Sequence, residues 1–116
     1  MKHALALLAL LSTPAYADGF KDREIAYQVL NAADAAQTCY AVSTGRGVEG
    51  NPLARAVIGQ RPSCASIFAF KAANGLLHYV LADAIRDRDP GAAKVFQIVS
   101  IVVQGGVVAA NMRVVF

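Results

Sequence analysis

The sequence predicts an all-α protein, a small bundle of three long helices plus one short helix, with a membrane-compatible C-terminal helix. Apolar residues recur at steps of three and four through residues 22–44, and the polar residues Lys71, Asn74 and His78 do so within residues 64–85, which is the period of an α-helix. Gly45 and the pair Pro90-Gly91 separate these stretches, as glycine and proline do between helices. From Cys64 onward the chain is short of charge, which is typical of deep packing or of membrane contact.

The first seventeen residues are typical of a secretory signal peptide. A short positive start, Lys2-His3, precedes an apolar run from Ala4 to Leu11, and Ala15-Tyr16-Ala17 has the small-x-small pattern of a cleavage site. The run is too short to span a bilayer comfortably. The sequence therefore predicts a signal peptide over residues 1–17 and a single helical envelope domain over residues 18–116.

The first long helix is expected to run from Asp22, as its N-cap, to about Thr44. One apolar stripe extends from Ile25 to Tyr40, and a second stripe leaves the helix little polar face. We therefore expect this helix to be buried on more than one side, with Asp34 and Thr38 among apolar neighbours.

A short helix and a second long helix are expected next. Asn51 can cap a short helix, Leu53 to Ile58, with Pro52 at its first position. Ser63 is the expected N-cap of the second long helix, Cys64 to Ile85, and the charged residues 86–91 are expected to form a solvated turn.

Residues 92–116 form the most apolar segment. Eighteen uncharged residues separate Lys94 from Arg113, which is the lower limit for a membrane span. Gln97, Gln104 and Asn111 are spaced seven apart and would share one face of a helix. A β-hairpin that turns at the two glycines is the competing interpretation, because valine and isoleucine dominate the segment.

Each long helix carries polar side chains on a face that is otherwise apolar. Buried polar groups are costly unless they are partnered, so the polar faces are expected to meet inside the bundle, with Asp34 pairing with Lys71 or His78. Such a network would either fix the packing alone or line a functional pocket. The candidate residues are Asp34, Gln37, Thr38, Glu49, Asn51, Lys71, His78, Gln97, Gln104 and Asn111.

Charge and motif content exclude several classes of function. The net charge is +3, and the basic residues are scattered rather than interleaved with aromatic ones, so no nucleic-acid partner is predicted. Neither a C-x-x-C motif nor paired histidines mark a metal site. Nucleophile motifs and glycine-rich phosphate loops are likewise missing from the sequence, so no catalytic residue and no cofactor is predicted.

Two cysteines, Cys39 and Cys64, predict one disulfide if this part of the chain lies in an oxidising compartment. The alternative is two unpaired, buried cysteines. They would stay reduced if several helices spanned the membrane and placed both residues on the cytoplasmic side.

Several short motifs follow one another in a recognisable order: D-x-x-Q-T at residues 34–38, E-x-N-P at residues 49–52, His78, F-Q at residues 96–97, and Asn111. This order resembles that of small exported proteins of unknown function from bacteriophages, prophages and proteobacteria. A looser similarity extends to bacterial membrane domains of unknown function in which G-x-E-x-N-P precedes a helical lysine, here Lys71. The resemblance implies a small helical bundle at the cell envelope and no known reaction.

Together these features predict a small exported, non-enzymatic envelope protein, located in the periplasm or in the inner membrane facing the periplasm. It is expected to contact the membrane and to bind another envelope protein, in phage lysis or superinfection exclusion; self-association into a homo-oligomer stays open. One alternative is a soluble periplasmic helical domain that binds or inhibits a partner. The other is a small hydrolase or metal enzyme that uses Asp34, Glu49 and His78.

Overall fold

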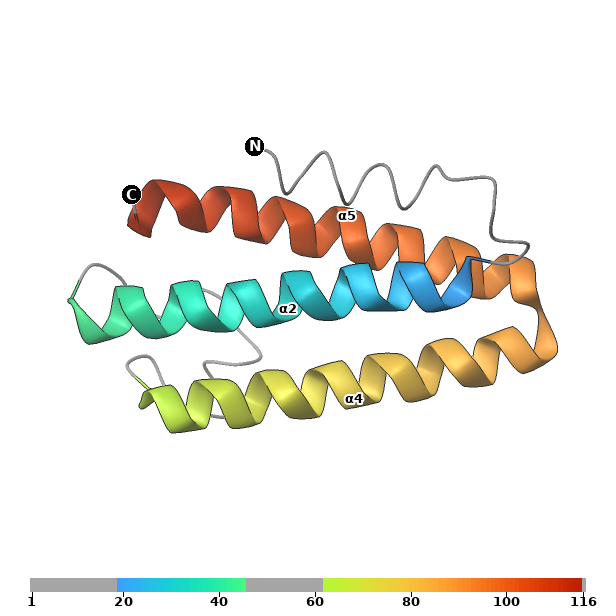
Figure 1. Ribbon diagram of the computed structural model, residues 1–116, viewed down its shortest axis with the longest axis horizontal. Helices are drawn as coiled ribbons and strands as arrows, with labels where there is room; N and C mark the ends of the chain where they lie inside the picture. The colour runs from blue at the N-terminus through green and yellow to red at the C-terminus, as the bar shows by residue number, and fades with distance from the viewer. Residues whose placement is uncertain (1–18, 46–61, 116) are drawn as a thin grey trace.

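The computed structural model describes residues 19–45 and 62–115, which form three long α-helices (Figure 1). They are α2 (Phe20–Ser43), α4 (Cys64–Arg88) and α5 (Pro90–Val115). The described residues contain no strand, so the all-α class is confirmed and the hairpin alternative for the C-terminal segment is wrong. The described residues contain three long helices and not the predicted additional short helix. That short helix, at residues 53–58, and the signal peptide predicted over residues 1–17 lie outside the described residues.

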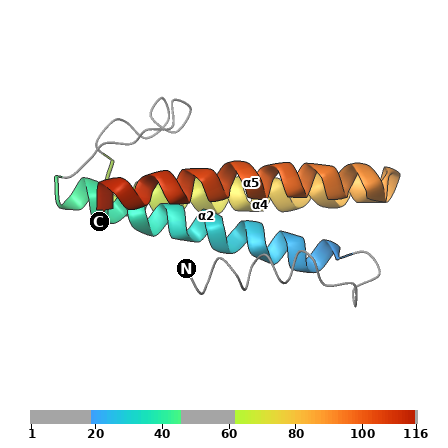
Figure 2. The same cartoon turned by 90° about the horizontal axis from the view of Figure 1, so that it is seen from above.

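The three helices pack against one another pairwise, and the chain runs in the same direction along α2 and α5 and in the opposite direction along α4 (Figure 1). Figure 2 shows α2 displaced to one side of α4 and α5, so the bundle is triangular in cross-section. One end of the bundle holds the start of α2 and the connection from α4 to α5, and we call it the charged end. The other holds the end of α2 and the start of α4, and we call it the disulfide end.

The starts of the first two helices depend on the residues that cap them. Gly19 caps α2 with a left-handed φ of 62°, and a Cβ there would lie 2.6 Å from Nη1 of Arg23. The predicted N-cap, Asp22, is therefore wrong: Gly19 caps the helix three residues earlier, because glycine permits this conformation. Ser63 is confirmed as the N-cap of α4, since its hydroxyl accepts a hydrogen bond from the Ser66 N–H at 3.1 Å.

A single residue, Asp89, connects α4 to α5. Its N–H donates to the Ile85 carbonyl at 2.7 Å, and its carboxylate accepts from the Ala92 N–H at 3.1 Å. Pro90 occupies the first position of α5, where a missing N–H has no cost. The predicted solvated turn over residues 86–91 is therefore exposed as expected at residues 87–91 but reduced to one residue, because Asp89 satisfies backbone groups of both helices and lets α4 continue to Arg88.

The apolar core of the described bundle is small. One cluster joins the helices at the charged end, and a second lies farther along α2 and α5. Polar side chains occupy much of the remaining interior. The clusters consist of Phe20, Ala82 and Ala93 with Ile85 and Phe96 packed against them, and of Ala26, Tyr27 and Ile101 with Leu30.

Candidate functional site

A first group of interior polar residues lies near the charged end and is centred on Glu24. Glu24 Oε2 lies 2.9 Å from His78 Nδ1 and accepts a hydrogen bond from Gln28 Nε2 at 2.7 Å. Glu24 Oε1 accepts from Gln97 Nε2 at 3.1 Å, and Arg23 Nε donates to Gln97 Oε1 at 2.9 Å. One carboxylate thus gathers polar groups from all three helices. We call these five residues the Glu24 cluster.

Two aromatic rings hold His78 on either side. Its imidazole stacks on Tyr27, with ring centroids 3.6 Å apart, and on Phe96 at 4.7 Å. The side chain is 7% exposed, and Nε2 has no hydrogen-bond partner among the described residues. Stacking and the contact with Glu24 therefore fix both the plane and the rotation of the ring.

Two asparagines bridge α2 and α4 in the middle of the bundle. Asn31 Nδ2 donates to the Lys71 carbonyl at 2.8 Å, and Asn74 Nδ2 donates to Asn31 Oδ1 at 3.3 Å. Gly75 lets the helices approach here, because a Cβ on it would lie 2.5 Å from Gln28 Oε1 and 3.2 Å from Asn31 Nδ2. Gln28 in turn donates to the Gly75 carbonyl at 2.8 Å.

A second charged group, the Asp34 cluster, lies farther along the bundle. Lys71 Nζ donates to Asp34 Oδ2 at 2.7 Å, and Gln104 Nε2 donates to the same oxygen at 3.0 Å. Asp34 Oδ1 accepts from Asn111 Nδ2 at 2.6 Å and from Thr38 Oγ1 at 3.3 Å. The cluster consists of Asp34, Gln37, Thr38, Lys71, Gln104 and Asn111.

Together the two clusters and the asparagine bridge form a polar ladder through the bundle, about 21 Å long from Glu24 to Thr38 at the rise of an α-helix. Its two carboxylates, Glu24 and Asp34, are equal in number to the buried cations, Arg23 and Lys71. The described interior is therefore neutral when His78 is uncharged. Buried ion pairs persist only where further hydrogen bonds satisfy them, as the glutamines and asparagines do here.

The outer surface of the helices has the opposite character. Within residues 25–40, 65–84 and 95–112, every exposed residue is apolar or glycine. We call this surface the apolar belt; it covers about 24, 30 and 27 Å of the three helices at 1.5 Å per residue. Its most exposed large members are Leu76, Val95, Val102 and Val103, at 61–67%.

Two of the described helices are long and apolar enough to cross a membrane, α4 over Cys64–Arg88 and α5 over Pro90–Arg113. The helix α2 is not one of them, and the one charged side chain within its belt segment, Asp34, is buried. The expected burial of the Ile25–Tyr40 stripe is therefore wrong. This stripe faces outward, and Asp34 lies among polar rather than apolar neighbours.

The structure brings most of the candidate residues predicted from sequence into the ladder. Asp34 contacts Lys71, the first of its two proposed partners, whereas His78 contacts Glu24 instead. Gln97 lies in the Glu24 cluster rather than with Gln104 and Asn111. Glu49 and Asn51 lie outside the described residues, and the other two residues of the alternative site, Asp34 and His78, lie in separate clusters.

Sequence reasoning missed several members of the ladder on α2. Glu24, Gln28 and Asn31 continue, at steps of three and four, the series that leads to Asp34 and Thr38. That spacing places them on one face and could have identified the ladder. Within the described residues, no group of three or more His, Cys, Asp or Glu side chains could hold a metal ion.

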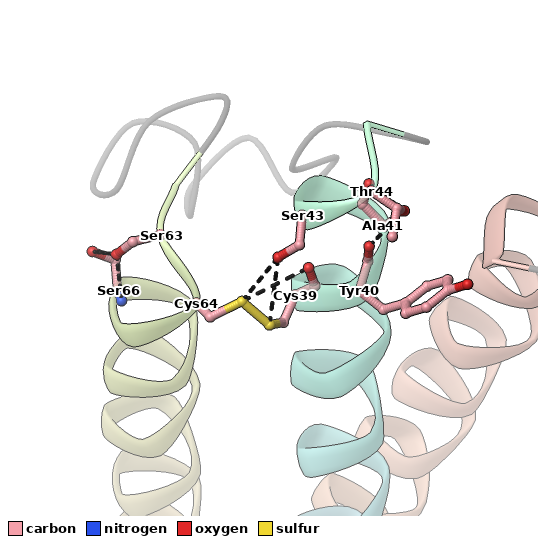
Figure 3. The surroundings of a disulfide bond; sticks show 8 residues. All are labelled: Cys39, Tyr40, Ala41, Ser43, Thr44, Ser63, Cys64 and Ser66. Atoms are coloured by element: carbon pink, nitrogen blue, oxygen red, sulfur yellow. Dashed lines mark hydrogen bonds between the residues drawn. A yellow bond between two sulfur atoms is a disulfide. The ribbon is translucent and has the colours of Figure 1, made fainter.

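A disulfide joins α2 to α4 at the disulfide end, as predicted (Figure 3). Cys39 and Cys64 lie with their Cα atoms 5.0 Å apart, 25 residues apart in sequence. Ser43 Oγ lies 3.2 Å from Cys64 Sγ and 4.0 Å from Cys39 Sγ. The bridge thus fixes the start of α4 next to the last turn of α2.

Residues 25–116 match the family described as "Domain of unknown function (DUF5658)", and the chain belongs to that family. The matched region begins with the apolar belt of α2 and includes the Asp34 cluster and both cysteines. No curated protein and no solved structure is significantly similar to the chain.

Proposed function

We propose that this member of the DUF5658 family is an integral membrane protein of the cell envelope that acts by binding another envelope protein rather than by catalysis. The observation that carries the proposal is the inverted polarity of the bundle. Its described interior holds two carboxylates and two cations, whereas the belt around it exposes only apolar residues and glycine. The belt is about 24–30 Å tall, which matches the roughly 30 Å hydrocarbon core of a bilayer.

Lipid explains both halves of this arrangement. Large apolar side chains exposed on every helix would be unfavourable in water, where contiguous apolar patches of this extent are rare. Inside a bilayer the same side chains need no protein cover, and polar side chains instead join helices by hydrogen bonds. The soluble periplasmic alternative would have to cover the belt with another protein.

The binding part of the proposal follows from how the interior polar groups are used. Glu24, Asp34 and Lys71 are each hydrogen-bonded to other members of the ladder. The surfaces that remain for recognition are the belt and the two ends. A role in phage lysis or superinfection exclusion stays a prediction from motif order; unchanged lysis timing and superinfection resistance in a deletion strain would argue against it.

The disulfide sets the orientation that we propose. Disulfides persist in oxidising compartments, so the disulfide end is placed on the periplasmic side. Lys and Arg do not decide the orientation: Lys21, Arg86, Arg88 and Lys94 lie at the charged end, Arg113 lies near the end of α5, and the sequence that links α2 to α4 contains Arg46, Arg55 and Arg61.

This orientation is incompatible with cleavage after Ala17. If α2 spans the membrane with its last turn outside, its first residue lies on the cytoplasmic side, out of reach of signal peptidase. We therefore expect the N-terminal segment to be retained. The intact mass of purified protein checks this directly: a chain that begins at Asp18 would contradict the proposed orientation.

Membrane integration and partner binding are tested separately with the full chain. Alkaline carbonate should leave the protein in the membrane pellet and detergent should release it, whereas release by osmotic shock would establish the soluble alternative. For binding, a photo-crosslinking residue at exposed Val103 should give a discrete adduct with another envelope protein, and one at buried Ile67 should not. Identical adducts from both positions, or none from Val103, would argue against a partner on this face of α5.

A further inference from the structure

A groove of about 660 Å³ runs between α2 and α4 from the charged end toward the middle of the bundle. Ile25, Val29 and Ala32 of α2 form its apolar wall, and Tyr79 faces them from α4. Its volume lies within the range of pockets that hold small molecules.

Two cations stand at the mouth of this groove. Lys21 is exposed, and no ion pair engages it within the described part of the chain. The Arg86 guanidinium lies 4.1 Å from the centre of the Phe20 ring and forms an ion pair with the Asp83 carboxylate at 2.6 Å, which engages one N–H group and leaves further N–H groups for an anion. Glu24, on the floor of the groove, is already bound by His78 and by glutamines.

The position of the groove relative to the apolar belt defines what fits it. From Phe20 to Ala32 it extends about 18 Å along α2, slightly more than one leaflet of the roughly 30 Å hydrocarbon core. Lys21 and Arg86 lie just outside the belt, which begins at Ile25 on α2 and ends at Ala84 on α4. The apolar wall therefore lies at the depth of an acyl chain and the cations at the depth of its phosphate.

We infer that this groove binds one anionic phospholipid of the cytoplasmic leaflet, with an acyl chain along Ile25, Val29 and Tyr79 and the phosphate between Lys21 and Arg86. The inference rests on the proposed membrane integration and orientation. It agrees with them electrostatically, because the cytoplasmic leaflet carries the anionic lipids that attract basic residues near its surface.

The test uses the full chain in phospholipid nanodiscs with spin-labelled lipids. Phosphatidylglycerol should show an immobilised fraction that exceeds that of phosphatidylcholine. Removing one cation, in Lys21→Gln, should weaken the preference about fivefold, since one basic residue near the surface contributes about that factor. Arg86→Lys keeps the charge and should preserve the preference, and Ala32→Trp should fill the groove and abolish the excess immobilisation of phosphatidylglycerol over phosphatidylcholine.

Lys94→Gln is the matched control, because it removes an exposed cation at the same end but outside the groove. If Lys94→Gln weakened the preference for phosphatidylglycerol as much as Lys21→Gln does, general surface charge would explain the preference and the proposed lipid site would be refuted. Equal immobilisation of both lipids, or a protein helix crosslinked in the groove, would overturn it as well. If the protein nevertheless stays in the membrane pellet after alkaline carbonate, only the lipid site is refuted and the proposed membrane integration still holds.

Discussion

Replacing Lys71 by methionine is expected to destabilise the bundle strongly, although methionine keeps the length and the apolar stem of the side chain. Lys71 is the cation in contact with Asp34, at 2.7 Å. In its absence the Asp34 carboxylate keeps only the neutral donors Thr38, Gln104 and Asn111. The side chain of Asp34 is 6% exposed, so water cannot replace the lost ammonium group.

Breaking a buried ion pair in this way costs about 3–5 kcal/mol, a large part of the roughly 5–15 kcal/mol that stabilises a folded domain. The double variant Asp34→Asn/Lys71→Met removes both charges and keeps a polar side chain for Gln104 and Asn111. We therefore expect it to be more stable than the single Lys71→Met variant. The two substitutions should be non-additive by about 1–3 kcal/mol, as directly interacting residues are.

The assay is unfolding of the full chain in bicelles by titration with a denaturing detergent, followed by circular dichroism. Lys94→Met, which removes an exposed cation on α5, serves as the control and should change stability by no more than about 0.5 kcal/mol. If Lys71→Met were as mild as this control, or if the effects at positions 34 and 71 simply added, the ladder would not hold the helices together as we argue.

Three further predictions use the same unfolding assay. Gly75→Leu should lower the free energy of unfolding by about 1–3 kcal/mol, because the leucine side chain would displace Gln28 and Asn31. Gly106→Leu is the control and should be tolerated, since a Cβ there meets nothing within 4 Å. Equal effects of the two substitutions would refute the close approach of the helices at Gly75. Cys39→Ser should lower the free energy of unfolding by about 3 kcal/mol, because the unfolded chain is no longer closed into a loop of 25 residues. A variant as stable as wild type would show that the disulfide contributes little. His78→Phe preserves stacking but removes the imidazole contact with Glu24, so a loss of about 1–3 kcal/mol is expected; no loss would mean that stacking alone holds this position.

Most of the architecture follows from local sequence rules. The helical period, the seven-residue spacing of Gln97, Gln104 and Asn111, and the capping hydroxyl of Ser63 are short-range features that tertiary contacts did not override. The expectation that polar faces meet inside the bundle is also realised, because a buried polar group leaves the chain few other options, as Asp34 illustrates with its partners on α4 and α5.

What could not be predicted is which side of each helix faces inward. Periodicity shows that Ile25, Val29, Ala36 and Tyr40 share a face of α2, but it does not show whether that face meets protein or its surroundings. The usual assumption that apolar faces point inward holds for water, and here it gave the wrong orientation of α2. The same assumption concealed Glu24, whose three-helix cluster depends on contacts 54 and 73 residues away in sequence.

The most direct test of the central claim is the surroundings of the apolar belt, measured with single spin labels on the full chain in a bilayer. The native cysteines are bridged, so only the introduced cysteine reacts. At Leu77 and Val102, which are 56% and 67% exposed, collisions with oxygen should exceed those with a water-soluble nickel chelate, and at Arg88 the order should reverse. Greater nickel accessibility at Leu77 and Val102 would place the belt in water and contradict the account.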